Sequence, residues 1–230
     1  SGFYRTLQSK NYKKCIVIIS DGFRYEMAHE LYELIRTDAI LKGSEKITCA
    51  ISPLPSETRF GMAALLPHQN LSYHNGDVYA DGLPTNSTAA RNAILKAKRS
   101  SYAAIQYEDI AQMKRQTLRS YMSDKSLVYV YHNVIDNVGE HNESKVFDVA
   151  AAAIKEILDL VKKIYNDLQI SNFFITADHG FVYRRNEVED SGKYSDVVSM
   201  YPTEAAKRYA ISNDTTFGIP YTLEYPLATA

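Results

Sequence analysis

The chain has 230 residues, of which 45% are hydrophobic, enough for one domain with a substantial core. Its 26 Lys and Arg against 27 Asp and Glu give a formal net charge of −1, which excludes a global basic field for nucleic acid, so any phosphate recognition must be local. No apolar stretch approaches the roughly 20 residues of a membrane span, and no secretory signal opens the chain, so we expect a cytoplasmic protein without a membrane partner.

The two ends of the sequence carry no capping or tail signal, so we expect residues 1–230 to be a single domain within a longer protein. The two cysteines, Cys15 and Cys49, lie in apolar, strand-like runs and form no CxxC pair. Buried free thiols are therefore expected.

The first predicted unit is a strand, an acidic turn and a helix. Residues 15–20 form a continuous β-branched run typical of a strand buried on both faces, and the run ends at Asp21 and Gly22. Residues 26–36 then repeat apolar side chains at helical spacing. A second strand is expected at 46–51 and, after a proline-rich approach, a second helix at 58–66.

The remaining elements alternate in the same way. Residues 68–88 are rich in Asn, Gly, Asp and Ser without periodicity, which indicates a long functional loop. The pattern predicts helices at 89–99, 108–122 and 145–168, strands at 102–105, 127–132 and 173–177, and short β-like pieces near 208–212 and 217–223. Such alternation implies an α/β fold with a mainly parallel sheet and helices on both faces.

Three carboxylates lie at or shortly after the ends of predicted buried strands: Asp21, Asp136 and Asp178. The carboxyl ends of parallel strands share one edge, so these residues can converge in one crevice. Crowded carboxylates repel one another unless a cation neutralises them, and His179 adds an imidazole nitrogen. This donor set suits zinc, with manganese or magnesium as alternatives. The competing interpretation is that each Asp merely caps the helix or turn that follows it.

Thr58 is the candidate nucleophile, because it opens a predicted helix whose free N–H groups attract a phosphoryl group. A metal or base must activate such a hydroxyl. An ordinary helix cap at Ser56 or Thr58 is the alternative. Arg24 and Arg59 are candidate substrate-binding residues, since a guanidinium can pair with phosphate oxygens, although both are equally interpreted as solvated charges.

Four ordered segments together resemble the PglZ domain, a branch of the alkaline phosphatase superfamily. They are residues 18–26 (IISDGFRYE), 53–62 (PLPSETRFGM), 131–140 (YHNVIDNVGE) and 176–181 (TADHGF). PglZ proteins occur in the BREX systems that restrict phage in bacteria. The resemblance therefore implies an alkaline-phosphatase-like fold and other defence-system proteins as partners.

The resemblance also implies metal ligands. In the superfamily one metal is held by an Asp after the first strand, the nucleophile and an Asp-His pair, which here are Asp21, Thr58, Asp178 and His179.

The second metal would use Asp136 together with Glu140 or His141, and the resemblance leaves open which of the two is the ligand. The histidine that the superfamily places far downstream has no counterpart, since no histidine follows His179 in this chain.

The implied function is a metal-dependent phosphohydrolase that acts on a phosphate ester, with nucleotides or nucleic acid as candidate substrates. Phosphodiester cleavage is slightly favoured over monoester cleavage. Two alternatives are a metal-binding scaffold with little or no turnover in a defence complex, and a small-molecule sensor domain.

Overall fold

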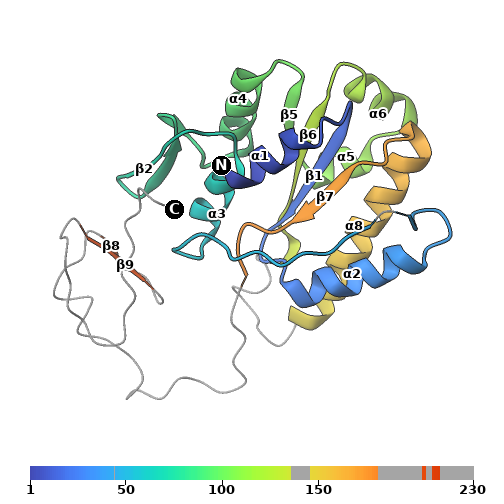
Figure 1. Cartoon of the computed structure of the whole chain (residues 1–230), viewed down its shortest axis with the longest axis horizontal. Coiled ribbons are helices and arrows are strands. Elements are labelled where there is room, and N and C mark those ends of the chain that lie inside the picture. The colour runs from blue at the N-terminus through green and yellow to red at the C-terminus, as the bar shows by residue number, and fades with distance from the viewer. Residues whose placement is uncertain (44, 136–145, 181–203, 206–208, 213–230) are drawn as a thin grey trace.

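The computed structural model describes residues 1–43, 45–135, 146–180, 204–205 and 209–212. Within these residues the main sheet has four parallel strands in the order β5-β6-β1-β7 (Figure 1). The strands are β1 (Cys15–Ser20), β5 (Tyr102–Gln106), β6 (Leu127–His132) and β7 (Phe173–Thr176). Helices cover both faces of this sheet, so the predicted α/β architecture is confirmed.

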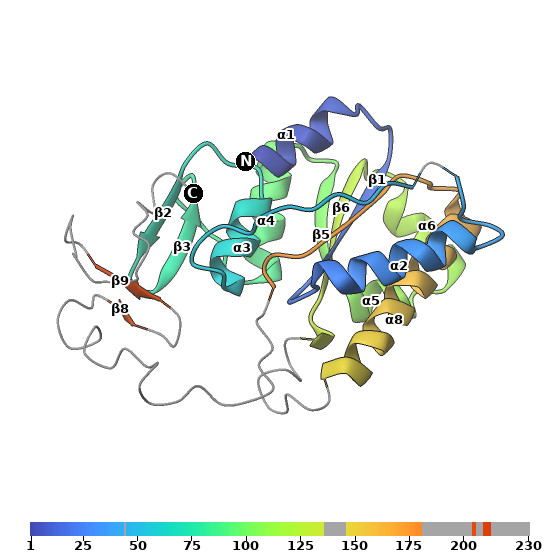
Figure 2. The same cartoon turned by 60° about the horizontal axis from the view of Figure 1, so that its bottom comes forward.

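Side chains that alternate along each strand define two apolar layers. Ile16 and Ile18 of β1 contribute to one layer, and Val17 and Ile19 contribute to the other, as the period of two in a strand requires. The first layer is covered by α2 (Tyr25–Thr37), α5 (Tyr107–Gln112), α6 (Arg115–Met122) and α8 (Val146–Leu168). The second is covered by α1 (Gly2–Ser9), α3 (Thr58–Leu65) and α4 (Thr88–Lys98) (Figure 2).

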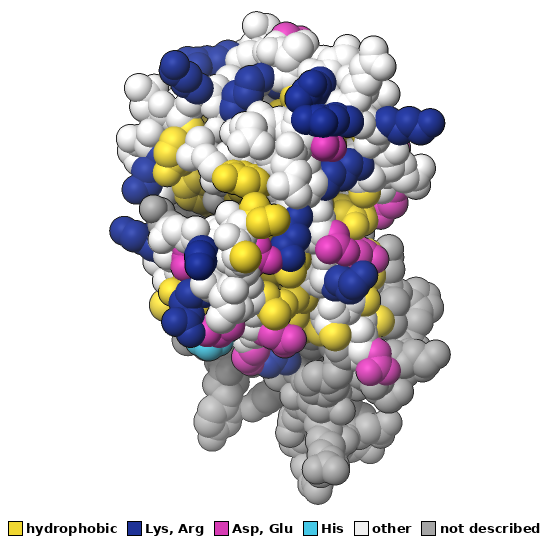
Figure 3. All heavy atoms as spheres, turned by 90° about the vertical axis from the view of Figure 1, so that its right-hand side faces the viewer, with side chains coloured by type: hydrophobic (Ala, Val, Ile, Leu, Met, Phe, Trp, Pro, Cys, Tyr) yellow, Lys and Arg dark blue, Asp and Glu magenta, His cyan; other side chains and the backbone are white. Residues whose placement is uncertain are grey.

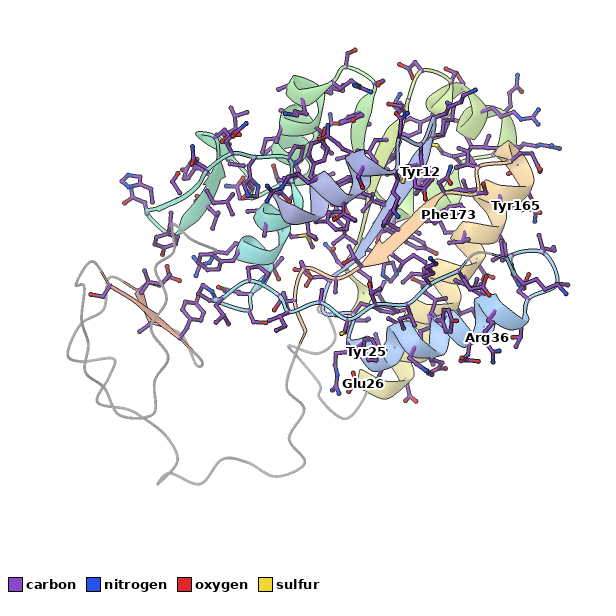
Figure 4. All side chains as sticks on the ribbon, viewed as in Figure 1. Tyr12, Tyr25, Glu26, Arg36, Tyr165 and Phe173 are labelled. Atoms are coloured by element: carbon purple, nitrogen blue, oxygen red, sulfur yellow. The ribbon has the colours of Figure 1, made fainter. Side chains whose placement is uncertain are left out.

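Helix α2 shows how a local pattern fixes an element. Glu26 lies in its first turn and Arg36 in its last, at the two ends seen in Figure 4. Each charge complements the partial charge of its helix end. Met27 and Leu31, four residues apart, are buried against the sheet. The helix therefore begins four residues after Asp21 and carries the chain away from the carboxyl edge.

The predicted long loop at 68–88 is wrong. The segment forms a small antiparallel sheet of β2 (Leu71–His74), β3 (Asp77–Ala80) and β4 (Leu83–Pro84). Its turns are Asn75-Gly76 and Asp81-Gly82, and all four residues have positive φ. Asn-Gly and Asp-Gly are the preferred pairs of two-residue hairpin turns, so the sequence held a signal for this sheet.

Three further expectations need correction. Residues 46–51 form no strand: most of their side chains are exposed, and no strand of the described residues pairs with them. Cys49 is accordingly exposed, whereas Cys15 is buried as expected, and both thiols are free. The helix expected at 108–122 is divided between α5 and α6. Helix α1 was not expected. Of the short β-like pieces near the end of the chain, β9 (Ala210–Ile211) lies within the piece expected at 208–212 and pairs with β8 (Glu204–Ala205). Residues 217–223 lie outside the described part of the chain.

The surface carries mixed charges. On the face drawn in Figure 3, Lys and Arg side chains lie among acidic and hydrophobic ones, in keeping with the near-neutral net charge. No helix in the described residues combines the length and the apolar composition needed to cross a lipid bilayer.

Candidate metal centre

Three of the predicted ligands meet at the carboxyl edge of the main sheet. Asp21 follows β1, and Asp178 and His179 follow its neighbour β7. One ligand atom from each lies within 4.8 Å of the other two, and the residues are only 3%, 2% and 6% exposed, respectively. His179 Nε2 lies 3.1 Å from Asp21 Oδ1. The structure thus brings together residues 157 positions apart, as parallel strand ends predict.

Thr58 places its hydroxyl against two of these three side chains, Asp21 and His179. Its Oγ1 lies 3.3 Å from both carboxylate oxygens of Asp21 and 3.0 Å from His179 Nε2. Thr58 is the first residue of α3, and the cap is Glu57, which makes no side-chain capping hydrogen bond. Neither Thr58 nor Ser56 is therefore the cap of this helix, and the Thr58 hydroxyl faces the acidic cluster.

Gly61 lets α3 approach the turn after β7, and the sequence analysis missed its role. A Cβ at this position would lie 2.3 Å from the carbonyl oxygen of Asp178 and 2.6 Å from its carbonyl carbon. Both distances are far inside van der Waals contact, so any other residue requires the backbone to move. A glycine inside an otherwise helical, apolar segment was the available signal, since glycine there usually costs helix stability.

The electrostatics of the cluster favour a bound cation. Burial, and then the negative charge of Asp21, raises the pKa of Asp178 to about 7. One Asp178 oxygen, Oδ1, accepts a 3.4 Å hydrogen bond from the N–H of Gly22, but the other, Oδ2, is buried without a hydrogen-bond partner. Its 3.6 Å separation from His179 Nε2 is too long for a hydrogen bond. A buried, unpartnered carboxylate oxygen is costly unless a cation or donor occupies the space beside it.

His179 is oriented by its own turn. Its Nδ1–H donates to the carbonyl of Gly180 at 2.9 Å, which leaves Nε2 facing Asp21 and Thr58. Burial opposes the charged imidazolium, but the hydrogen bond to Asp21 and the charge of Asp178 outweigh it and raise the pKa of His179 to about 9. Two carboxylates, one imidazole and one hydroxyl form a donor set that fits a divalent metal, and zinc, manganese and magnesium all accept such donors.

The predicted ligands of a second metal, Asp136, Glu140 and His141, lie outside the described residues. A two-metal arrangement therefore stays a prediction.

The two candidate substrate-binding arginines are placed differently. Arg24 lies beside the Asp178 turn, where its Cγ would be 3.9 Å from a Cβ on Gly180, and its guanidinium pairs with Glu26. Arg59 is turned into a network with other parts of the chain. Its guanidinium donates to the carbonyl of Gly76, to the carboxylates of Glu57 and Glu204 and to the hydroxyl of Tyr209. Phosphate would have to compete with two carboxylates for Arg59, and both roles stay predictions.

A parallel α/β sheet with a buried acidic and imidazole cluster at its carboxyl edge and a helix-start threonine facing it is the arrangement of alkaline phosphatase-like proteins. The chain belongs to the PglZ family, since the family model of the BREX system PglZ alkaline phosphatase-like domain matches residues 4–217.

Two curated relatives are similar over most of the chain. The "Alkaline phosphatase-like protein PglZ" of Bacillus cereus (strain H3081.97) is 37% identical over 218 residues, which are 94% of this chain and 25% of the relative. The "Alkaline phosphatase-like protein BrxZ" of Escherichia coli O9:H4 (strain HS) is 40% identical over 191 residues, which are 81% of this chain and 22% of the relative. The chain thus spans about a quarter of the length of these proteins. No solved structure matches it.

Proposed function

We propose that this domain is a metal-dependent phosphohydrolase of a BREX defence system, with Thr58 as the nucleophile. The observation that carries the proposal is the position of the Thr58 hydroxyl, 3.3 Å from the Asp21 carboxylate and 3.0 Å from His179 Nε2, at the start of a helix. A threonine that only stabilised α3 would cap it, and Thr58 does not. Family membership supports the same chemistry, because both relatives are named alkaline phosphatase-like.

Each residue of the site has its own role in the proposed reaction. Asp21, Asp178 and His179 would hold the metal, which when bound favours the ionised hydroxyl and neutralises phosphate oxygens. Asp21 accepts from the Thr58 hydroxyl and so orients its oxygen. Thr58 Oγ1 gives up its proton to solvent and forms a bond to phosphorus while the bond to the ester oxygen breaks, and that oxygen takes a proton from solvent and leaves as an alcohol. Water then cleaves the phosphothreonine, which releases phosphate and restores the Thr58 hydroxyl. The positive end of α3 stabilises the transferred group.

The substrate class is a phosphate ester, and a diester is slightly favoured by the likeness of the Asp21 to Arg24 turn to the phosphodiesterase branch. Nucleotides and nucleic acid are therefore the first substrates to try. Zinc is the first metal to try, followed by manganese and magnesium.

The test is a metal-supplemented assay of p-nitrophenyl phosphate against bis(p-nitrophenyl) phosphate. Thr58→Ala should lower the rate by at least about a hundredfold, and Thr58→Ser should retain part of it, because serine keeps the hydroxyl. Thr37→Ala is the matched control, since this threonine ends α2 and its hydroxyl donates to carbonyls of its own helix. Unchanged turnover in Thr58→Ala would refute the proposed nucleophile.

A scaffold that binds metal without turnover is the second candidate. It is favoured by Glu140, which stands where related phosphodiesterases usually place a histidine. Under this alternative the chain binds metal at Asp178, yet neither aryl phosphate is cleaved above the rate of Thr58→Ala with any of the three metals.

A further inference from the structure

A row of hydrogen-bonded polar groups starts beside Asp21, on residues that take no part in the proposed chemistry. Ser20 and His132 are the last residues of β1 and β6, they are direct neighbours in the sheet, and both are 0% exposed. Ser20 Oγ lies 2.9 Å from His132 Nδ1, and His132 Nε2 lies 2.9 Å from Glu156 Oε2 on α8. These two hydrogen bonds therefore link the ends of β1 and β6 to the long helix α8 on one face of the sheet.

Both ring nitrogens of His132 have hydrogen-bond partners. Glu156 is half-exposed, and an ionised carboxylate can only accept, so the proton on the His132 side of that contact belongs to Nε2. Nδ1 lies within hydrogen-bond distance of the Ser20 hydroxyl, which can either donate or accept. The ring is also held edge-on by Tyr107, with 4.8 Å between ring centroids. His132 thus has both nitrogens and its ring edge occupied, which leaves it one orientation.

His132 is tied to the ligand Asp21 by two independent routes. Its carbonyl accepts a 2.8 Å hydrogen bond from the N–H of Asp21, and its ring holds Ser20, the residue covalently before Asp21. The backbone that enters Asp21 is therefore held by the carbonyl of His132 and, through Ser20, by its buried ring. Fully satisfied buried networks are rigid, whereas one with a missing partner leaves a costly unpaired group and relaxes.

We propose that His132, held by Ser20 and Glu156, is a positioning residue that aims Asp21 at the metal. This inference rests on the proposed function, because it assumes that Asp21 is a ligand. Partners that orient a ligand from outside typically change metal affinity by tenfold or more when they are removed. A purely structural role for the same contacts would lower stability and leave the affinity of the folded protein unchanged.

The experiment is calorimetric titration of metal-free protein with zinc. Ser20→Ala and His132→Phe should each weaken zinc binding by about tenfold, and Glu156→Gln by less, because its amide oxygen still accepts from Nε2–H. Leu118→Ala is the control, since this buried leucine belongs to the same core cluster as α8 but offers no hydrogen bond to the polar groups, and the zinc affinity of the variant should stay within about twofold of wild type.

The outcomes separate the two proposals. If wild type binds zinc and Ser20→Ala binds it equally well, the positioning role is wrong while the metal centre stands. If wild type binds none of zinc, manganese or magnesium, the proposed function fails and the positioning role fails with it. Ser20→Ala decides the question should His132→Phe not fold, because it removes one oxygen atom from a strand end.

Discussion

Gly61 and Asp178 lie so close that the α3 backbone rests against the Asp178 carbonyl, with no room for a Cβ between them. This contact joins the helix that carries Thr58 to the turn that carries two of the three ligands. Thr58 and the turn of Asp178 and His179 are therefore held in register by backbone packing as well as by the contact between Thr58 and His179.

Substitution of Gly61 should expose that dependence. Gly61→Ala puts a methyl carbon 2.3 Å from the Asp178 oxygen, so we expect the free energy of unfolding to fall by about 1–3 kcal/mol and zinc affinity to drop as the turn shifts. Urea unfolding and calorimetry measure the two effects. Gly43→Ala is the control, because nothing lies within 4 Å of its added Cβ. Wild-type affinity in Gly61→Ala would show that the close approach is dispensable.

The pH dependence of the metal-free protein follows from the two raised pKa values. Asp178 rises from 3.8 to about 7 and His179 from 6.5 to about 9, so the folded state holds more protons than the unfolded state. Their contribution is fully present at low pH. It is lost as pH rises from about 4 to about 9, and unfolding in a chelator measures it. The opposite slope in the difference between wild type and Asp178→Asn would contradict the assigned pKa of Asp178.

Saturating metal should reverse this slope, because cation and protons compete for the same atoms. We expect the stabilisation by zinc, measured as the shift of the unfolding midpoint, to grow between about pH 6 and about pH 8. Stabilisation that is independent of pH would mean that the metal binds elsewhere.

Asp178→Asn should separate binding from folding. The amide keeps the shape of the side chain and can still accept from the N–H of Gly22, while it removes a buried charge beside Asp21. We expect the metal-free variant to be at least as stable as wild type at about pH 8 and to bind zinc at least tenfold more weakly. Asp77→Asn is the matched control for a carboxylate outside the cluster.

Arg59→Ala should loosen the β8-β9 pair, because Arg59 joins Glu57 at the start of α3 to Glu204 and Tyr209. The side chains are partly exposed, so a loss of about 1 kcal/mol in unfolding free energy is expected. Faster amide hydrogen exchange at Ala210 and Ile211 would report the loosening. A rise in KM for aryl phosphate with unchanged exchange would instead support the predicted phosphate contact.

The strand ends explain how much of the site could be predicted from the sequence. The runs 15–20 and 173–177 are mostly apolar, and each is followed at once by an acidic residue, so parallel pairing alone predicts that Asp21 and Asp178 meet. The partners of Arg59 could not be predicted in this way. Glu204 lies 145 residues away, on a two-residue strand with no periodic pattern of its own.

The local sequence pattern gave wrong predictions at 46–51 and at 68–88, where burial in the folded protein decides whether a strand forms. The run at 46–51 has the composition of a strand, but a strand needs a partner and a buried face, and these side chains are mostly exposed. Conversely, β2 and β3 are partly exposed hairpin strands whose strongest signal was the Asn75-Gly76 turn between them. Composition alone could not separate the two cases.

The pairing of β1 with β7 also dictates when the centre can form during folding. Asp21 and Asp178 follow β1 and β7, and the chain forms β5, β6 and α8 between these two strands. Their approach is therefore among the contacts of longest sequence separation. Loop-closure entropy makes such contacts late and slow. Zinc should therefore bind completely assembled molecules and not earlier folding species. The rate of zinc binding during refolding would then report the rate of the last step of sheet assembly.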